Sequence, residues 1–425
     1  MNITVHPAAL KGTVNAIPSK SQAHRMLICA AFADKQTKIK CPQVSDDIKA
    51  TVNCLNSFGS DITYKDDTYI VTPIKKDCNS AVYADCGESG STLRFLIPVA
   101  GALGRDTVFT MHGRLSDRPL SPLWEELERH GMVLKKQGDK LYCSGKIKSG
   151  AYTIDGGVSS QFISGLMFAL PLLSGKSKIC ITGKSESAKY IEMTRLAVRM
   201  FGVQIAAEQN EFEITGNGDF VSPNEAFVEG DWSNSAFWLC AAAAGRTKIS
   251  VDGLNPSSPQ GDKYITEQLK NYGCNITESN GLYTVSADKL NSCEVDGSEI
   301  PDLIPVIAGV AAVSDGNTHI YGASRLKFKE SDRLKAVYDM LTNIGADIKL
   351  NDDGFEINGL GEKGLTGGTV DGCGDHRIVM TAAIMASACK NDIKIIGAQA
   401  VNKSYPTFWN DYVRMGGKIT KTVEE

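Results

Sequence analysis

One pattern of hydrophobic and polar positions recurs six times along the chain. Each copy is an amphipathic stretch that ends at a glycine, followed by two residues and then a β-prone residue. The glycines lie 71 or 72 residues apart, at Gly59, Gly131, Gly202, Gly273, Gly345 and Gly416. Because glycine has no Cβ, it readily adopts the left-handed conformation that commonly follows a helix. The pattern therefore predicts six helices that end at these glycines and lead into strands.

Each repeat contains two kinds of helix. In the fifth copy Leu334, Val337, Leu341 and Ile344 follow the helical period on one face, as an amphipathic helix does. The second helix of each repeat is apolar on nearly all sides. These segments are SQAHRMLICAAFA, SGSTLRFLIPVAGAL, SSQFISGLMFALPLL, SNSAFWLCAAAA, DLIPVIAGVAAV and DHRIVMTAAIMASA. A helix without a polar face is buried, so we expect these six at the domain centres.

Short β-branched runs lie between the helices. They are ITVHP, KIKC, DTVFTM, SKICITG, TKISVDG, NTHIYG and DIKIIGA. The chain is thus predicted to be an α/β protein with six mixed repeats of about 71 residues, three in each of two domains. We expect the boundary near EAFVEGDW, where Gly230 supplies a flexible hinge. Repetition alone also suits a structural solenoid, so function has to be argued from the polar residues.

Composition narrows the class of partner. A chain of 425 residues, 42% hydrophobic and 22% charged, is too long for one ordinary core and has a globular composition. The net charge of -4 comes without a Lys/Arg block, which argues against nucleic acid or an anionic membrane as partner. We expect small-molecule substrates instead.

The chain also lacks the features of export. Its start, MNITVHPAAL, has no charged region followed by an apolar core, and the longest apolar stretches run only about a dozen residues. The 12 cysteines are scattered singly, without a C-x-x-C pair. We therefore expect reduced thiols, no signal peptide, no membrane span and a cytoplasmic location.

Polar clusters recur at the starts of the apolar helices. They are Pro18-Ser19-Lys20-Ser21, Glu88-Ser89-Gly90-Ser91, Ser159-Ser160-Gln161, Asp231-Trp232-Ser233, Pro301-Asp302 and Asp375-His376-Arg377. Ser, Asp and Glu at such places can simply cap the free N–H groups of a first turn. Capping does not explain Lys20 or Arg377, because a cation at the positive end of a helix is unfavourable unless an anion is shared with it.

A second set of polar clusters is expected at the starts of the amphipathic helices. It comprises Ser45-Asp46-Asp47, Asp117-Arg118-Pro119, Lys189-Tyr190, Lys329-Glu330-Ser331-Asp332-Arg333 and Lys403-Ser404-Tyr405-Pro406. If symmetry-related repeats point their helix starts inward, seven cations converge on one cleft. They are Lys20, Arg25, Arg118, Lys329, Arg333, Arg377 and Lys403. Such a cleft suits a substrate with several anionic groups.

Two acids, Asp302 and Glu330, lie among these cations in the sequence. A carboxylate inside a cationic cleft stays ionised at neutral pH and can take or relay protons. Both acids can also serve merely to offset the neighbouring positive charge.

Taken in order, these motifs resemble the EPSP synthase family of enolpyruvyl transferases over essentially the whole chain. The matching segments are Pro18-Ser19-Lys20-Ser21 with Arg25, Asp46-Asp47, Asp117-Arg118-Pro119-Leu120, Ser159-Ser160-Gln161-Phe162, Ser187 with Tyr190, Pro301-Asp302, Lys329 to Arg333, Asp375-His376-Arg377 and Lys403 to Pro406. Any one motif is weak evidence, but nine in the same order are strong evidence.

The resemblance implies a fold of two inverse α/β barrels, each built from three βαβαββ-type repeats. The first domain would span residues 19–230, and the second would combine 1–18 with 231–425. The active site would lie in the cleft between them.

The resemblance also implies an activity and its residues. The enolpyruvyl group of phosphoenolpyruvate would pass to the 5-hydroxyl of shikimate 3-phosphate by addition and elimination through a tetrahedral intermediate. The residues around shikimate 3-phosphate would be Lys20, Ser21, Arg25, Ser159, Ser160, Gln161, Ser187, Asp302 and Lys329. Those around phosphoenolpyruvate would be Lys20, Gly90, Arg118, Gln161, Arg333, Arg377 and Lys403.

In this scheme Asp302 fits as base for the 5-hydroxyl, Glu330 as the group that exchanges a proton with the methylene carbon, and Lys20 as partner of the departing phosphate. No metal, nucleotide or covalent cofactor is implied. The expected setting is a cytoplasmic monomer in the shikimate pathway, which leads through chorismate to the aromatic amino acids.

Two segments depart from the family's pattern. The family often has Asn-Ala-Gly-Thr where this chain has Glu88-Ser89-Gly90-Ser91, so Glu88 must be neutralised by a neighbour or turned away, and we leave it out of the site. The family also often has Asn a few residues before the Lys-Glu motif, whereas residues 322–327 here read GASRLK. The contact with shikimate 3-phosphate from that segment is therefore unassigned.

Two other functions fit parts of the pattern. UDP-N-acetylglucosamine enolpyruvyl transferases share the double barrel. They usually carry a reactive Cys in the loop before the Arg-Pro, but residues 111–117 here read MHGRLSD and contain no Cys. They also usually show Lys-Asn in the first motif, where this chain has Lys20-Ser21. A scaffold that binds phosphorylated metabolites without turnover would be expected to lose an acid, yet Asp302 and Glu330 are both present.

Overall fold

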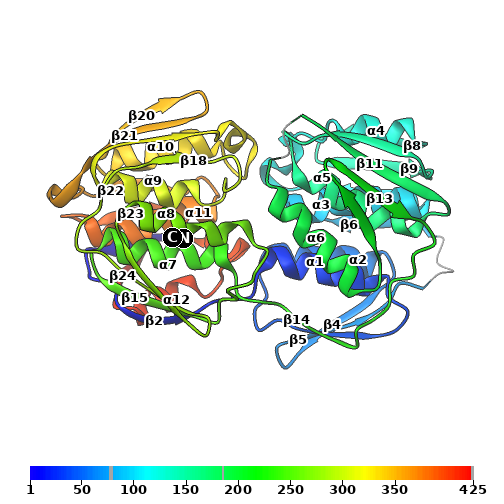
Figure 1. Ribbon diagram of the computed structural model, residues 1–425, viewed down its shortest axis with the longest axis horizontal. Helices are drawn as coiled ribbons and strands as arrows, with labels where there is room; N and C mark the ends of the chain where they lie inside the picture. Colours follow the sequence, from blue (N-terminus) through cyan, green and yellow to red (C-terminus); the bar gives the residue numbers. More distant parts are fainter. Residues whose placement is uncertain (76–79, 184–185, 423–425) are drawn as a thin grey trace. The chain divides into compact units, whose positions relative to one another are not determined.

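The computed structural model describes residues 1–75, 80–183 and 186–422, and it divides the chain into two compact units (Figure 1). Unit 1 comprises Met1–Ile17 and Glu229–Glu425, and unit 2 comprises Pro18–Val228. Each unit has its own continuous hydrophobic core.

Among the described residues, each unit contains three four-stranded sheets with one common pairing. In every sheet one pair of strands is parallel and the next two pairings are antiparallel. In spatial order the sheets of unit 2 are β14 (Glu225–Phe227), β3 (Thr37–Lys40), β5 (Thr68–Thr72), β4 (Asp61–Lys65); β6 (Val82–Asp85), β7 (Thr107–Thr110), β9 (Lys140–Gly145), β8 (Met132–Gln137); and β10 (Ala151–Asp155), β11 (Lys176–Thr182), β13 (Glu211–Thr215), β12 (Ile205–Glu208).

The sheets of unit 1 repeat this plan. They are β2 (Gly12–Asn15), β15 (Lys248–Asp252), β17 (Leu282–Ser286), β16 (Asn275–Ser279); β18 (Glu294–Asp296), β19 (Asp315–Tyr321), β21 (Gly354–Leu360), β20 (Asp347–Asn351); and β22 (Gly368–Asp371), β23 (Ile393–Ile396), β1 (Asn2–His6), β24 (Lys418–Thr422). The first and last strands of the chain therefore pair with each other, antiparallel, in one sheet.

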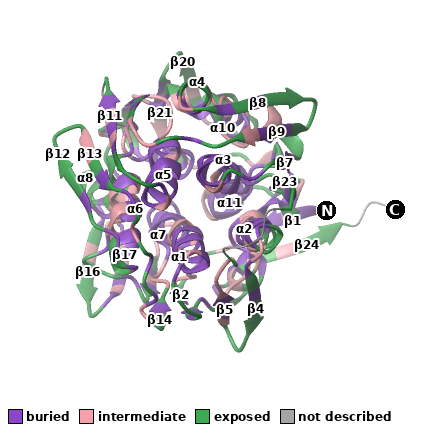
Figure 2. Ribbon diagram, turned by 90° about the vertical axis from the view of Figure 1, so that its right-hand side faces the viewer, coloured by how far each residue is buried: buried purple, intermediate pink, exposed green. Residues whose placement is uncertain are grey.

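Six helices form the centres of the units. They are α1 (Lys20–Ala31), α3 (Gly90–Leu103) and α5 (Ser160–Ala169) in unit 2, and α7 (Trp232–Ala244), α9 (Ile304–Ala312) and α11 (His376–Met385) in unit 1. Every residue of α7, α9 and α11 is buried, and α3, α5 and α11 are purple in Figure 2 amid strands with exposed positions. The expectation that the apolar helices are buried is confirmed, because no polar face is available to meet water.

The other helices are amphipathic or short. They are α2 (Asp46–Ser57), α4 (Leu123–Arg129), α6 (Ala188–Met200), α8 (Ile265–Asn271), α10 (Arg333–Asn343) and α12 (Phe408–Arg414). Short 3-10 turns complete the described part of the chain: η1 (Gly113–Asp117), η2 (Leu170–Leu172), η3 (Gly261–Tyr264), η4 (Ser324–Phe328), η5 (Gly361–Lys363), η6 (Ala386–Ala388) and η7 (Ala398–Lys403).

The repeat glycines end these helices as predicted. All six have a φ between 84° and 110°, a conformation that disfavours a side chain. Gly59, for example, follows the C-cap of α2, and its N–H donates to the carbonyl of Asn56. The repeat and the mixed α/β class are confirmed.

Gly230 lies where two segments of unit 1 approach closely, and its role as a hinge stays a prediction. A Cβ at this position would lie 2.4 Å from the carbonyl oxygen of Gly253 and 2.9 Å from the Cβ of Ala16. Two backbone segments of unit 1 therefore approach too closely for any side chain. Glycine is required here for space, at the point where the chain returns to unit 1.

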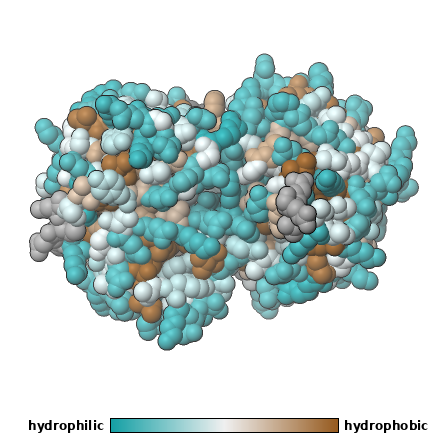
Figure 3. Space-filling view, turned by 180° about the vertical axis from the view of Figure 1, so that it is seen from behind, coloured by the Kyte–Doolittle hydropathy of each residue, from teal (hydrophilic) through white to brown (hydrophobic). Residues whose placement is uncertain are grey.

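Most apolar side chains are buried in the two cores. The face in Figure 3 is largely hydrophilic, with brown patches scattered over it. Within the described ranges, none of the helices is both long and apolar enough to cross a membrane.

Candidate active site

Arg333 is the centre of a charged cluster in unit 1. It is the first residue of α10 and only 1% exposed. Its Nη1 donates to Asp302 at 2.9 Å and its Nη2 to Glu330 at 2.5 Å. Its Nε donates to Asp375 at 2.9 Å. Burial opposes the charge of Arg333, but Asp375, Glu330 and Asp302 favour it more, so its pKa is raised. The guanidinium thus binds three carboxylates that come from separate segments of the sequence.

Asp302 is not used as a helix cap. Helix α9 begins two residues later with Leu303 as its N-cap and with no side-chain cap. The Asp302 carboxylate is therefore available to Lys329, whose Nζ lies at 3.3 Å, and to Arg377, whose Nη2 lies at 3.0 Å. Burial raises the pKa of Asp302, but Arg377, Lys329 and Arg333 lower it by more, and the net pKa lies well below the ordinary value. The side chain remains 21% exposed, so it is an ionised carboxylate within reach of solvent.

Lys329 lies between η4 and α10. Burial lowers the pKa of Lys329 to about 8, and the attraction of Asp302 only partly offsets this. The amine can therefore lose its charge in mildly alkaline solution, unlike the guanidinium groups beside it.

The start of α11 contributes the remaining groups of unit 1. Asp375 is its N-cap and accepts from the backbone N–H of Arg377 at 2.9 Å. Arg377 donates to the carbonyl of Asp302 at 2.8 Å and to the hydroxyl of Ser233 at 2.7 Å. Lys403 donates to the carbonyl of Gly374, at 2.6 Å, just before this helix. The structure therefore brings five predicted site residues of unit 1 into direct contact, with Lys403 close to them.

The sequence predicts Arg118 and Lys403 at the starts of helices, but the structure places neither of them there. Arg118 follows η1 and Lys403 ends η7, while α4 and α12 begin only at Leu123 and Phe408. In each of these repeats the cation ends or follows a 3-10 turn, and four further residues, 119–122 or 404–407, lie between it and the helix. The expectation that these two cations begin helices is therefore wrong, whereas Lys20, Arg333 and Arg377 each lie in the first turn of a helix, where the macrodipole disfavours a cation.

In unit 2, Lys20 opens α1 and has an acidic partner. Its Nζ lies 2.7 Å from Oδ2 of Asp47, the second residue of α2, and both side chains are about 15% exposed. An aspartate thus already offsets the cation for which the sequence suggested a bound anion.

Arg25 is 3% exposed and ties three segments together. Its Nη1 donates to the carbonyl of Ser21 at 2.6 Å, its Nη2 to the carbonyl of Tyr190 at 3.0 Å, and its Nε to the hydroxyl of Thr194 at 2.8 Å. Its guanidinium lies 5.2 Å from the ring centre of Phe95, and burial lowers the pKa of Arg25 to about 10. These contacts position the starts of α1 and α6.

The starts of α3 and α5 also meet in unit 2. Ser159 caps α5, and Ser160 is buried behind it. The amide of Gln161 donates from Nε2 to the hydroxyl of Ser91 at 2.8 Å. Gly90 lies against Arg118, because a Cβ on Gly90 would be 2.5 Å from Nη1 of that arginine.

Ser187 and Glu88 flank this region. Ser187 precedes α6 in a left-handed conformation, with φ 57°, and is 3% exposed. A non-glycine residue held in this conformation is often found at functional sites. The Glu88 carboxylate lies over Gly113 of η1, where a Cβ would be 2.6 Å from its Oε2. Glu88 is thus directed at the turn that precedes Arg118.

Three further polar residues were not assigned from the sequence. Asp375 and Ser233 hold the arginines of unit 1, as described above, and Arg94 holds Gln161 in unit 2. Arg94 had a signal: it is the one charged residue within the apolar segment SGSTLRFLIPVAGAL, and an arginine is rarely buried without a partner.

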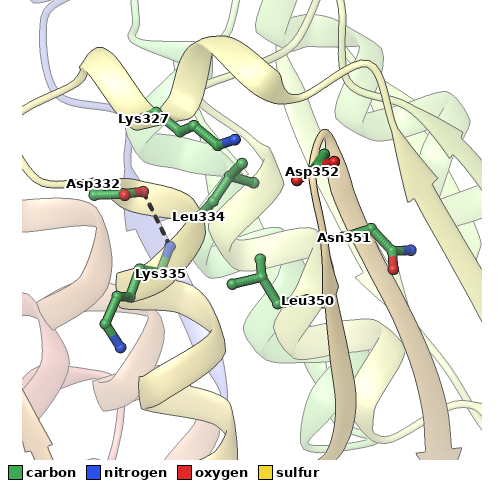
Figure 4. Close-up of a pocket in the computed structure, with 7 residues that line it drawn as sticks. All are labelled: Lys327, Asp332, Leu334, Lys335, Leu350, Asn351 and Asp352. Carbon is green, nitrogen blue, oxygen red and sulfur yellow. Dashed lines mark hydrogen bonds between the residues drawn. The ribbon is translucent and has the colours of Figure 1, made fainter.

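A separate pocket of about 590 Å³ lies beside the start of α10 (Figure 4). Its lining comprises Lys327, Asp332, Leu334, Lys335, Leu350, Asn351 and Asp352. Asp332 is engaged as the helix N-cap, 3.2 Å from the backbone nitrogen of Lys335, and the Lys335 amine pairs with Asp339. None of the predicted site residues lines this pocket. In the described part of the chain no group of His, Cys, Asp and Glu is arranged to hold a metal ion.

Comparison with known proteins points to the same family as the motifs of the sequence. A family model described as EPSP synthase (3-phosphoshikimate 1-carboxyvinyltransferase) matches residues 5–412. Proteins named 3-phosphoshikimate 1-carboxyvinyltransferase from Clostridium kluyveri and Clostridium beijerinckii are each 41% identical to this chain, with 98% of both sequences covered.

A solved EPSP synthase from Acinetobacter baumannii shares the fold. Its TM-score is 0.80 at 24% identity, with 99% of this chain and 100% of that chain covered. These matches do not favour the UDP-N-acetylglucosamine enolpyruvyl transferases. A match over nearly the whole length, together with Asp302, Glu330 and their arginines in contact, shows that the chain belongs to the EPSP synthase (3-phosphoshikimate 1-carboxyvinyltransferase) family.

Proposed function

We propose that this protein transfers the enolpyruvyl group of phosphoenolpyruvate to the 5-hydroxyl of shikimate 3-phosphate and releases phosphate. The observation that carries the proposal is the contact of Arg333 with Asp302 and Glu330 in a chain of this family. Cations that can grip phosphate and carboxylate thus lie beside two acids that can move protons.

The residues divide between the two substrates as the family resemblance implies. We assign shikimate 3-phosphate to Lys20, Ser21, Arg25, Ser159, Ser160, Gln161, Ser187, Asp302 and Lys329. We assign phosphoenolpyruvate to Lys20, Gly90, Arg118, Gln161, Arg333, Arg377 and Lys403.

The chemistry is an addition followed by an elimination. Asp302 removes the proton of the 5-hydroxyl as the hydroxyl oxygen attacks the C2 atom of phosphoenolpyruvate, and Glu330, in its protonated form, gives its proton to the methylene carbon. In the elimination Glu330 takes a proton back from the resulting methyl group, phosphate leaves towards Lys20, and the proton held by Asp302 passes to the departing phosphate. Supporting these roles, both acids are about one-fifth exposed and are oriented by Arg333.

We further propose a cytoplasmic monomer that acts in the shikimate pathway, upstream of chorismate and the aromatic amino acids. Supporting this setting, the described helices include none that could span a membrane. Light scattering coupled to gel filtration measures the oligomeric state, and a mass near 45.7 kDa is expected.

The decisive experiment is release of phosphate from phosphoenolpyruvate in the presence and absence of shikimate 3-phosphate. We expect release only with both substrates, together with a product whose mass equals shikimate 3-phosphate plus the enolpyruvyl group. Phosphate release that does not depend on shikimate 3-phosphate, or binding of both substrates without turnover, would contradict the proposal. The second outcome would instead support the non-catalytic scaffold.

A further inference from the structure

Arg94 is a buried cation in a helix whose neighbouring positions are apolar. It lies in the second turn of α3 and is 4% exposed. Burying a guanidinium is costly unless its donors are satisfied. Its Nη1 donates to Oε1 of Gln161 at 2.8 Å, and its Nη2 donates to the carbonyl of Pro119 at 3.0 Å. Both acceptors belong to segments that carry proposed site residues.

The contact with Gln161 decides which way its amide faces. A guanidinium has only donors, so the oxygen of the amide must face Arg94 and the NH₂ group must face away. The Nε2 atom accordingly lies 2.8 Å from the hydroxyl of Ser91. One hydrogen of this NH₂ group serves Ser91, and the second is available to an anionic oxygen. Without Arg94 the amide could rotate and present its oxygen instead, which an anion would repel.

The contact with Pro119 acts on a second segment. Pro119 directly follows Arg118, whose guanidinium packs against Gly90 at the start of the same helix. Arg94 also lies 5.5 Å from the ring centre of Phe162, next to Gln161. One buried side chain therefore holds the start of α3, the start of α5 and the segment after η1 in a single arrangement.

We infer that Arg94 is a positioning residue: it orients the Gln161 amide and the Arg118 segment so that both offer donors to the anionic substrates. The inference rests on the proposed function, since it assigns to Arg94 an effect on substrate binding without contact with substrate.

The chain offers a matched control in Arg105. This arginine is 6% exposed and donates to the carbonyls of Phe58, at 2.5 Å, and Ser80, at 3.0 Å. Its guanidinium also lies 5.7 Å from an aromatic ring centre. It follows the far end of α3, a helix of 14 residues and thus about 20 Å long. Arg94 and Arg105 therefore share burial and bonding, but only Arg94 reaches the proposed site.

The test compares Arg94→Met with Arg105→Met by steady-state kinetics and thermal unfolding. We expect both variants to lose stability. Arg94→Met alone should raise the KM for phosphoenolpyruvate by about ten- to a hundredfold, the value of one charge-assisted hydrogen bond, with a smaller change in kcat. If Arg105→Met raises KM as much, or Arg94→Met leaves it within about twofold of wild type, the inference is wrong.

A double-mutant cycle with Gln161→Ala separates positioning from general destabilisation. If Arg94 acts in part through the amide, Arg94→Met should raise KM several-fold less in the Gln161→Ala background than in the wild type. Equal effects in both backgrounds would overturn this part of the inference.

If Arg94→Met does not fold, Arg94→Lys takes its place, because it keeps the charge but cannot serve both acceptors at once. The same two criteria then apply to it. Wild-type turnover is measured first: its absence refutes the proposed function, whereas normal turnover with an inert Arg94 variant refutes only the inference.

Discussion

Replacing Gly90 by alanine is expected to weaken phosphoenolpyruvate binding while leaving the fold intact. A Cβ on Gly90 would lie 2.5 Å from Nη1 and 2.9 Å from Cζ of Arg118. Heavy atoms in ordinary contact are about 3.5 Å apart or more, so the guanidinium must move by roughly 1 Å. The obstacle is the end of a flexible side chain, and alanine favours a helix over glycine by up to about 1 kcal/mol. Stability should therefore stay level or rise slightly.

The binding penalty follows from the bond that Arg118 would make. A hydrogen bond to a charged group contributes about 1.5–3 kcal/mol, and a shift of roughly 1 Å at the guanidinium removes much of it. This corresponds to about a ten- to hundredfold rise in the KM for phosphoenolpyruvate. The KM for shikimate 3-phosphate should change far less, because Arg118 is not assigned to that substrate.

The assay is steady-state phosphate release at varied concentrations of each substrate, with Gly101→Ala as the matched control. A Cβ on Gly101, in the same helix, would lie 3.0 Å from side-chain atoms of Ile147 and Met132 in the core. This variant should lose about 1–3 kcal/mol of stability from overpacking and keep its KM. In an Arg118→Ala background, Gly90→Ala should add no further penalty. A full penalty in that background, or a loss of stability like that of Gly101→Ala, would refute the steric argument.

Four further predictions concern the charged cluster of unit 1. Asp302→Asn and Glu330→Gln should each lower kcat by about 10²- to 10⁴-fold while calorimetry shows shikimate 3-phosphate still bound; near-normal turnover would remove the assigned role. Burial lowers the pKa of Lys329 from 10.5 to about 8, so its charge in the free protein is lost as the pH rises through 8. The affinity for shikimate 3-phosphate, measured by calorimetry, should fall over the same pH range. Lys329→Arg should make this affinity nearly independent of pH there. The same lowered pKa makes the contribution of Lys329 to stability rise between about pH 8 and 10.5, where only the unfolded chain holds the proton. Asp375→Asn removes a buried charge opposite Arg333 and should cost about 3–5 kcal/mol in urea unfolding, and a loss below about 1 kcal/mol would contradict this.

Features that depend on local sequence were predictable. The six glycines predict the helix ends because a helix often ends at a residue in the left-handed conformation, which depends only on the local backbone. Each of the six has a positive φ in the structure. The buried helices were likewise visible, since α7 and α9 have no polar face to expose. Asp302, Glu330 and Arg333 could be placed near one another because the repeat related their positions.

Features that depend on contacts distant in sequence were not predictable from composition or period. The turn η1 before Arg118 has no strong sequence signal, so the helix start was expected several residues too early. The need for glycine at position 230 comes from Gly253, which approaches it in space and not along the chain. Arg94 was visible as an anomaly in an apolar helix, but its acceptors come from segments 25 and 67 residues away.

Arg333 of unit 1 is bonded differently from Arg25 and Arg94 of unit 2, and the difference bears on the proposed catalysis. Arg25 and Arg94 in unit 2 donate to carbonyl, hydroxyl and amide oxygens, so those bonds persist whether or not an anion is present. In unit 1 the guanidinium of Arg333 is shared among carboxylates. An arriving anion must compete with those carboxylates for its charge. In the proposed mechanism, each cation that turns from Asp302 towards the substrate lowers the pKa of Asp302 by less. The pKa of Asp302 is therefore expected to rise on substrate binding, which would make the carboxylate a better base.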